Sequence, residues 1–203
     1  VDIDRLLELT KQVAPAALPM SVSHRTYRRE PSFTVAIARD PAFNFMYEAN
    51  IRYLHHLGEV TYFSPLADTS LPDTGFVYLP GGYPELYLAA LSANRPMLQS
   101  IRRYVENGGK LLAECGGMMY LCDEIRDKNG DVYPMAGVLH QSATMENMKL
   151  RLGYRTLLYD DARLKGHEFH YSRLVERQDP LPSCAVAYTA KGVETDTPLY
   201  HYK

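Results

Sequence analysis

Residues 110–121 read Lys-Leu-Leu-Ala-Glu-Cys-Gly-Gly-Met-Met-Tyr-Leu, and this stretch says most about the fold. A short apolar run leads through a cysteine and two glycines into a segment of helical character. A buried strand that turns sharply into a helix is the geometry of a nucleophile elbow, which presents one side chain above the edge of a sheet. The glycines let neighbouring chain pass close to a residue held in a strained conformation. The pattern predicts a reactive Cys115, with a small buried thiol at a tight turn as the alternative.

The start of the helix also bears on the chemistry of Cys115. Unpaired N–H groups and the positive end of the helix dipole favour a thiolate, and the N–H of Gly116 could stabilise an oxyanion. We expect Cys122, two helical turns further on, and Cys184 to be structural. Three cysteines without paired spacing indicate neither a disulfide framework nor a zinc site, so we expect no metal.

Outward from this stretch, strand-like and helix-like segments alternate. Strands are expected at 33–38, 59–63, 76–79 and 110–114, and helices at 44–57, at 116–125 and in a segment that ends near 107–109. This alternation, with short Gly and Pro turns, predicts a parallel sheet with helices on both faces. After Asp127 the strand-like pieces 132–139, 149–157, 167–171 and 185–189 have little helix between them. We expect them to form a mixed or antiparallel extension of the sheet.

The N-terminal residues differ from the rest of the chain in composition and in the spacing of their apolar residues. Residues 2–13 have the spacing of a short amphipathic helix, and a polar, basic, proline-interrupted stretch follows as far as Pro31. We therefore expect an appendage and linker at 1–31 and one domain at 32–203, which suits a chain of 203 residues.

The composition excludes several classes of function. The net charge is −2 and the only basic cluster is residues 25–29, which we interpret as solvated linker, so no nucleic-acid partner is expected. The longest apolar stretches fall short of the roughly 20 residues that a membrane span needs. Residues 1–5 do not resemble a secretory leader, and sparse unpaired thiols suit a reducing compartment. We expect a cytoplasmic protein.

A second glycine turn, Pro80-Gly81-Gly82, follows the expected strand at 76–79. Such a turn can direct backbone N–H groups toward an anion or oxyanion, although a plain Pro-Gly-Gly turn is the alternative. In a parallel sheet the carboxyl ends of the strands share one edge, where ligands bind. Both glycine turns should therefore open onto the same crevice.

A thiol nucleophile needs a base, and histidine is the usual one. Residues 166–172 read Gly-His-Glu-Phe-His-Tyr-Ser, and alternate residues of a strand share a face. Glu168 and His170 then point the same way, so the carboxylate could orient the imidazole. On these grounds alone His140 stays a second candidate, and a structural, hydrogen-bonded His170 is the alternative.

Three segments carry a specific resemblance. Residues 79–85, 113–121 and 166–172 resemble the marker segments of the cobyrinic acid a,c-diamide synthase family, in its C-terminal class I glutamine amidotransferase domain. The resemblance runs from about residue 33 to the end, and residues 150–155 also fit it. It implies a flavodoxin-like three-layer fold with a largely parallel central sheet and a mixed or antiparallel C-terminal extension.

The resemblance also implies a division of labour. Such a domain hydrolyses glutamine through a γ-glutamyl thioester, and a P-loop synthetase domain uses ATP and Mg²⁺ to activate the a and c carboxylates of cobyrinic acid. No G-x-x-x-x-G-K-[ST] segment occurs among these residues. We therefore expect the glutaminase half alone, without a cofactor of its own, and residues 1–31 as the remnant that joins the halves. The expected partners are glutamine, the synthetase domain and a corrinoid acceptor.

Carried over residue by residue, Cys115 matches the nucleophile, His170 the base, and Gly82 and Gly116 the oxyanion-hole positions. Many class I enzymes have glutamate two residues after the histidine, where this chain has Ser172. We therefore expect a Cys–His dyad with Glu168 as the candidate orienter. The alternatives are a cysteine hydrolase or peptidase-like relative, and a catalytically silent module that docks on a synthetase.

Overall fold

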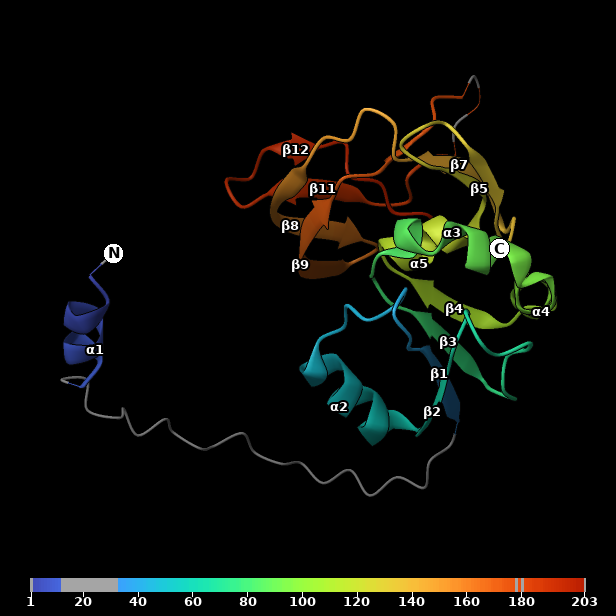
Figure 1. Ribbon diagram of the computed structural model, residues 1–203, viewed down its shortest axis with the longest axis horizontal. Coiled ribbons are helices and arrows are strands. Elements are labelled where there is room, and N and C mark those ends of the chain that lie inside the picture. The colour runs from blue at the N-terminus through green and yellow to red at the C-terminus, as the bar shows by residue number, and fades with distance from the viewer. Residues whose placement is uncertain (1, 12–32, 178, 180, 203) are drawn as a thin grey trace. The chain divides into compact units, whose positions relative to one another are not determined.

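The computed structural model describes residues 2–11, 33–177, 179 and 181–202 (Figure 1). Contacts divide the chain into two units, residues 1–30 and 31–203. The first contains α1 (Ile3–Lys11), which confirms the short helix expected there. The remainder of the expected linker, from residue 12 to 31, lies outside the described residues. Among the described helices, none is long and apolar enough to cross a membrane.

The second unit is built on a parallel four-stranded sheet of order β2-β1-β3-β4. Its strands are β1 (Thr34–Ala38), β2 (Glu59–Phe63), β3 (Phe76–Leu79) and β4 (Lys110–Ala113). Each lies within one residue of the expected bounds. The expectation of burial on both faces, made for the first strand, holds for β1, in which four of five residues are buried, whereas β2 and β4 are more exposed.

Helices cover both faces of this sheet. On β1, Val35 and Ile37 pack with Ile51 of α2 (Glu48–Leu57), whereas Ala36 joins the cluster that contains Ile101 of α4 (Arg95–Glu106). Successive strand side chains point to opposite faces, so this division makes three layers (Figure 1). The short η1 (Pro84–Leu86) and α3 (Leu88–Ala93) connect β3 to α4.

Two helices are shorter than expected. α2 begins at Glu48 rather than near residue 44, because the preceding segment pairs with the second glycine turn through Phe45 and Gly81. α5 (Gly116–Leu121) ends four residues early, and Cys122–Arg126 is strand β5. Helical continuation to residue 125 was wrong because β5 pairs with strands on both sides. Cys122 is fully buried, as a structural thiol should be.

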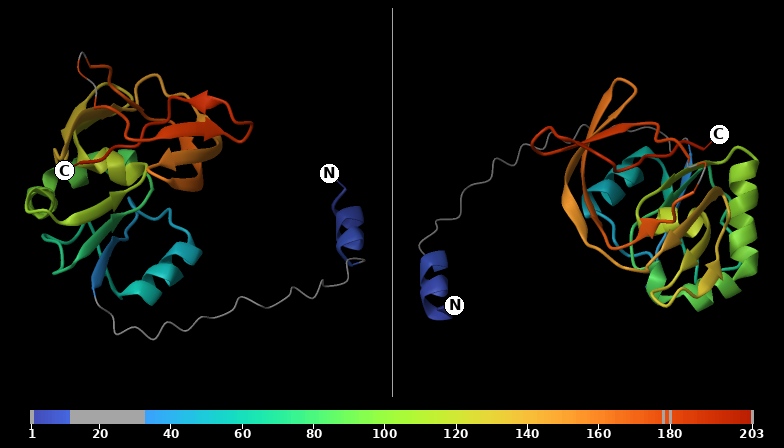
Figure 2. Two further views of the ribbon diagram at one scale, coloured as in Figure 1. Left: turned by 180° about the vertical axis from the view of Figure 1, so that it is seen from behind. Right: turned by 90° about the horizontal axis from the view of Figure 1, so that it is seen from above.

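The chain after Asp127 is rich in strands, which belong to two further sheets (Figure 2), but the piece expected at 132–139 is divided because residues 135–138 form no strand. The mixed sheet, of order β10-β7-β5-β6, also contains β6 (Val132–Pro134), β7 (Leu139–Thr144) and β10 (Arg173–Leu174). The antiparallel sheet, of order β12-β11-β8-β9, consists of β8 (Arg151–Tyr159), β9 (Ala162–His170), β11 (Val186–Thr189) and β12 (Glu194–Thr195).

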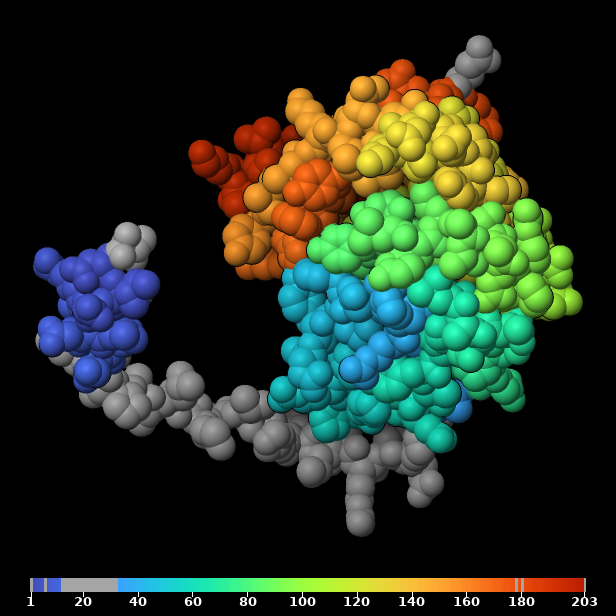
Figure 3. All heavy atoms as spheres, in the orientation of Figure 1, coloured from blue at the N-terminus to red at the C-terminus, as the bar shows by residue number. Residues whose placement is uncertain are grey.

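The β8–β9 hairpin lies against the segment that follows β1. Phe45 and Tyr47 each make an edge-on ring contact with His167 of β9, and the Tyr47 hydroxyl forms a hydrogen bond with that ring. The space-filling view shows the orange β8–β9 surface meeting the light-blue surface of this segment (Figure 3). The contact brings the last residues of β9 to the carboxyl edge of the parallel sheet.

Candidate active site

Cys115 sits between β4 and α5 with φ 47° and ψ −108°. Side-chain-bearing residues rarely adopt a positive φ, so the backbone at this position is strained. The residue is exposed. Gly117, two residues on, donates its N–H to the Pro80 carbonyl at 3.1 Å, and a Cβ there would lie 2.2 Å from the Leu79 carbonyl oxygen. The end of β3 therefore packs directly on the first turn of α5, which requires a glycine.

The two expected oxyanion positions adjoin each other. A Cβ built at Gly116 would lie 3.2 Å from the Gly82 nitrogen, and one built at Gly82 would lie 2.1 Å from the Ala42 carbonyl oxygen. Apart from the interaction of the Gly116 N–H with the neighbouring Cys115 sulfur, neither glycine donates to an acceptor elsewhere in the described chain. The two glycine turns thus meet at one edge of the sheet, where the Gly82 N–H has no acceptor in the described residues and the Gly116 N–H contacts only the Cys115 sulfur.

The electrostatics of Cys115 differ from expectation. Although part of Cys115 is open to solvent, the atoms packed around its sulfur desolvate the thiol and raise its pKa above the usual value. The N–H of Gly116 lowers this pKa, and the carboxylates of Glu85 and Glu114 raise it further. The helix that begins here has only six residues, so its dipole is small. The Gly116 N–H acts in the direction expected at the start of a helix, but burial and the two carboxylates outweigh it, so a base is needed to remove the thiol proton.

His170 ends β9, close to Cys115 but turned away from it. The Cys115 sulfur lies 4.0 Å from the carbonyl oxygen of Phe169, the residue that precedes His170. The His170 ring makes its own hydrogen bonds, from Nδ1 to the Ser172 carbonyl oxygen and from Nε2 to Glu168 Oε1, each at 2.8 Å. In the described residues no hydrogen bond joins His170 to the thiol. The backbone is thus in place for a dyad, while the ring is not.

Glu168 is the centre of a buried polar network. It is 7% exposed, accepts a hydrogen bond from Thr197 Oγ1 at 3.1 Å and forms an ion pair with Arg155. Burial raises its pKa, but the hydrogen bonds from His170 and Thr197 and the Arg155 charge outweigh burial and hold the pKa below its usual value. Glu168 is therefore ionised, and both His170 nitrogens face acceptors.

The second candidate base, His140, lies elsewhere. It belongs to β7, where Nδ1 is 3.3 Å from Asp123 Oδ1, and its carbonyl accepts a hydrogen bond from Arg177. In the described part of the chain, no contact joins His140 to Cys115. Burial raises the pKa of the Cys122 thiol to about 12, so that thiol is inert as well. Of the two candidate bases, His140 and His170, the one at the end of β9 is therefore the one that lies near Cys115.

Residues 34–201 match the family described as CobB/CobQ-like glutamine amidotransferase domain. The chain belongs to this family. It is similar to the hydrogenobyrinate a,c-diamide synthase of Pseudomonas aeruginosa, with 40% identity over 88% of this chain and 38% of that protein. It is also similar to the cobyrinate a,c-diamide synthase of Dehalococcoides mccartyi strain CBDB1, with 39% identity over 93% of this chain and 42% of that protein.

These relatives are much longer than the chain. It spans about two fifths of the length of the curated relatives that it matches. Among solved structures it resembles PurLQS from Thermotoga maritima, with a TM-score of 0.56 and 17% identity over 82% of this chain and 77% of that one. At this identity the likeness concerns the fold. It confirms the class I glutamine amidotransferase architecture expected from the sequence.

Three residues near the amidotransferase site were not singled out from the sequence. Glu85 and Glu114 raise the pKa of Cys115 through their charge, and Glu114 accepts a short hydrogen bond from the Tyr78 hydroxyl. Asp40 follows β1 and organises the segment that backs Gly82. The signal for Asp40 was available, because it lies at the same carboxyl sheet edge as the glycine turns.

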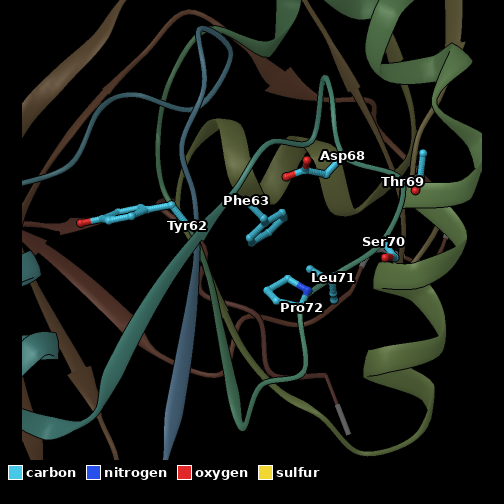
Figure 4. A pocket seen from close by; sticks show the side chains of 7 residues that line it. All are labelled: Tyr62, Phe63, Asp68, Thr69, Ser70, Leu71 and Pro72. Atoms are coloured by element: carbon cyan, nitrogen blue, oxygen red, sulfur yellow. The ribbon is translucent and has the colours of Figure 1, made fainter.

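One pocket in the described residues has a lining that does not include Cys115. It has a volume of about 290 Å³ at the end of β2 and in the loop that follows (Figure 4). Its lining consists of Tyr62, Phe63, Asp68, Thr69, Ser70, Leu71 and Pro72. None of the amidotransferase site residues lines it. In the described residues, no three histidine, cysteine or acidic side chains gather as a metal site.

Proposed function

We propose that this domain hydrolyses glutamine to glutamate and ammonia through a thioester on Cys115. One observation carries the proposal: a positive-φ cysteine at a strand-to-helix turn lies beside two glycines, and neither glycine N–H donates to an acceptor other than the Cys115 sulfur in the described residues. A carboxamide carbon held against the thiol would direct its oxygen toward Gly82 and Gly116. Hydrogen bonds to the developing oxyanion at this position usually make the largest single contribution to stabilising the transition state.

The reaction needs one thiol proton to be moved. A base removes it from Cys115 as the sulfur attacks the glutamine carboxamide, and the tetrahedral oxyanion forms at Gly82 and Gly116. The C–N bond then breaks, and the protonated base gives its proton to the departing nitrogen, which leaves as ammonia. Water, deprotonated by the same base, cleaves the thioester to glutamate and restores the thiol.

His170 is the base in this proposal, and it has to change its contacts first. In the resting arrangement its ring is held by Glu168 and the Ser172 carbonyl, at 2.8 Å from each. A turn of the neutral ring toward the thiol would complete the dyad. Glu168, ionised and held by Arg155, would then act as orienter and stabilise the imidazolium formed during the reaction.

The molecule that accepts the ammonia is inferred from the names of the relatives and not from the geometry of the site. Because the similar proteins are named cobyrinate and hydrogenobyrinate a,c-diamide synthases, we propose that the ammonia amidates the a and c carboxylates of cobyrinic acid or a close relative. Activation of those carboxylates by ATP and Mg²⁺ is assigned to a P-loop synthetase domain. The G-x-x-x-x-G-K-[ST] segment that such a domain requires does not occur among the 203 residues.

Covalent chemistry tests the glutaminase proposal. A diazo-ketone analogue of glutamine should add to Cys115 and spare Cys122 and Cys184, as read by intact mass and peptide mapping. The matched control is Cys184→Ser, because Cys184 is also exposed and its loss should leave labelling unchanged. Labelling at another residue, or none even with a synthetase domain supplied, would overturn the mechanism.

The contacts of His170 favour one alternative, a domain that is catalytically silent and docks on a synthetase. Both ring nitrogens are engaged away from the thiol, and the Cys115 pKa is raised. The same labelling experiment separates the two. A silent module would leave Cys115 unlabelled with and without the synthetase domain, whereas a glutaminase that needs its partner would be labelled when the partner is added.

A further inference from the structure

Asp40 stands at the junction of three loops at the carboxyl edge of the parallel sheet. It follows β1, and its half-buried carboxylate accepts four hydrogen bonds. Oδ1 accepts from the backbone N–H groups of Ala42 at 2.8 Å and Phe43 at 3.1 Å. Oδ2 accepts from the loop after β2, at 2.9 Å from Ser64 Oγ and 3.0 Å from the Leu66 nitrogen. One carboxylate therefore fixes the segment after β1 to the loop after β2.

The segment that Asp40 holds is the support of the second glycine turn. The Tyr83 N–H donates to the Ala42 carbonyl at 2.9 Å, and the Phe45 N–H donates to the Gly81 carbonyl at 3.0 Å. Between these two bonds lies Gly82, which packs so closely on Ala42 that a Cβ there would lie 2.1 Å from the Ala42 carbonyl oxygen. The position of the Gly82 N–H thus depends on where this segment sits.

The same segment also contacts the helix that follows the nucleophile. The ring of Phe43 lies 5.3 Å from the ring of Tyr120 in α5, centroid to centroid, and both residues are fully buried. The Tyr120 hydroxyl is the one buried side-chain polar atom without a partner in the described residues. Burial, followed by the charge of Asp40, raises its pKa. Asp40 is therefore close to the packing that sets α5 against the glycine turn.

We propose that Asp40 is a positioning residue of the oxyanion hole, which fixes the Ala42–Phe45 segment so that the Gly82 N–H faces the Cys115 site. Asp40 touches neither substrate nor thiol and acts through Ala42. The assignment rests on the proposed glutaminase chemistry. Loss of the carboxylate should let the glycine turn shift, and displacements of about 1 Å at a reacting centre cost on the order of 100-fold in rate.

The test compares two cysteine reagents on the whole chain, with the synthetase domain added if the wild type requires it. In Asp40→Ala, the first-order rate constant for covalent labelling by the diazo-ketone glutamine analogue should fall about 10- to 100-fold, with little change in its half-saturating concentration. Alkylation of Cys115 by iodoacetamide, which needs no oxyanion hole, should stay within about twofold. Asp40→Asn keeps an acceptor for one pair of donors, so its diazo-ketone labelling rate should lie between those of the wild type and Asp40→Ala.

Asp127→Ala is the matched control. Asp127 Oδ1 holds the β5–β6 turn by accepting from the nitrogens of Asn129 at 2.7 Å and Asp131 at 3.0 Å. Its loss removes bonds of the same kind without touching the glycine turn, so both labelling rates should be unchanged. Should Asp40→Ala fail to fold, Asp40→Asn carries the test.

The outcomes separate this assignment from the function beneath it. If the wild type is labelled and the folded Asp40 variants are labelled equally fast, the positioning role is overturned while the glutaminase proposal stands. If both reagents slow in parallel, the effect is general loosening of the site and the positioning role is equally overturned. A wild-type chain that is never labelled at Cys115 overturns the glutaminase proposal and this assignment with it.

Discussion

Glu168 Oε1 lies 2.8 Å from His170 Nε2, so the resting histidine is directed at its carboxylate and not at Cys115. The two residues are neighbours on one face of β9, two positions apart. The carboxylate is buried and ionised, held by Arg155 and Thr197 as well. In the resting arrangement the imidazole therefore has a buried anionic partner on its own strand, which is what an orienting group requires.

Glu168→Gln should weaken both stability and thiol activation. The change leaves the largely buried Arg155 guanidinium without its counter-charge, and the free energy of unfolding at pH 7 should fall by about 1–3 kcal/mol. Labelling of Cys115 by the diazo-ketone should slow, because the amide no longer stabilises the imidazolium. Urea unfolding and the labelling rate measure the two effects. Full labelling activity in the variant would remove Glu168 from the site.

The pH dependence of stability gives Glu168 a separate signature. Its folded pKa lies below the ordinary value of 4.5, so its contribution is fully present above pH 4.5 and is lost as pH falls through the folded pKa. Between pH 6 and about pH 3, the wild type should therefore lose more unfolding free energy than Glu168→Gln. Arg52→Ala, which removes the exposed pair with Glu48 on α2, is the control and should keep the acid sensitivity due to Glu168.

Cys115→Gly should be more stable than Cys115→Ala. Both changes remove the thiol, but only glycine adopts φ 47° and ψ −108° without strain, and such strain costs on the order of 1–3 kcal/mol. Glycine also gains freedom in the unfolded chain, which offsets part of this difference. The melting temperatures of the two variants measure this difference in stability. An alanine variant as stable as the glycine variant would mean that the elbow stores no strain.

The sequence predicted the parts of the site that depend on local pattern. The strands of the parallel sheet, the cysteine elbow and the shared edge of Gly82 and Gly116 all follow from apolar runs and glycine turns. The end of α5 did not, because residues 119–125 suit a helix or a strand and only pairing with β6 and β7 decides between them. Long-range pairing is invisible in a local window.

The ionic contacts of the site were also beyond the sequence. Strand alternation put Glu168 and His170 on one face, but it gave no sign that Arg155 and Thr197 would hold that carboxylate. Burial and two carboxylates outweigh the short helix in setting the pKa of Cys115; Glu114 directly precedes the cysteine, whereas Glu85 comes from η1 after β3. The pKa of a side chain depends on contacts with other segments of the fold, whereas a backbone turn can be predicted from the few residues that form it.

Glu85→Gln should make the thiol of Cys115 more acidic. The Glu85 carboxylate raises the Cys115 pKa, so its removal should lower that pKa toward the ordinary value of 9.0. At pH 8 a larger fraction of thiolate should raise the rate of alkylation by iodoacetamide by about two- to fivefold. Peptide-resolved rates across pH 7–10 measure the midpoint. Glu106→Gln, an exposed change at the end of α4, is the control and should leave the pH profile of Cys115 alkylation unchanged. A higher midpoint in Glu85→Gln would contradict the predicted fall in the Cys115 pKa.

Gly82→Ala and Gly81→Ala are neighbouring changes with opposite expected outcomes. A Cβ at Gly82 would meet the Ala42 carbonyl oxygen at 2.1 Å, a backbone atom that cannot move aside without shifting the turn. At Gly81 the nearest atoms are Phe45 side-chain carbons at 3.5 Å, which is ordinary contact. Gly82→Ala should therefore slow diazo-ketone labelling of Cys115 by about 100-fold or more, the scale of losing one oxyanion donor. Gly81→Ala should stay within a few-fold, and equal rates in the two variants would rule out the Gly82 N–H as part of the oxyanion hole.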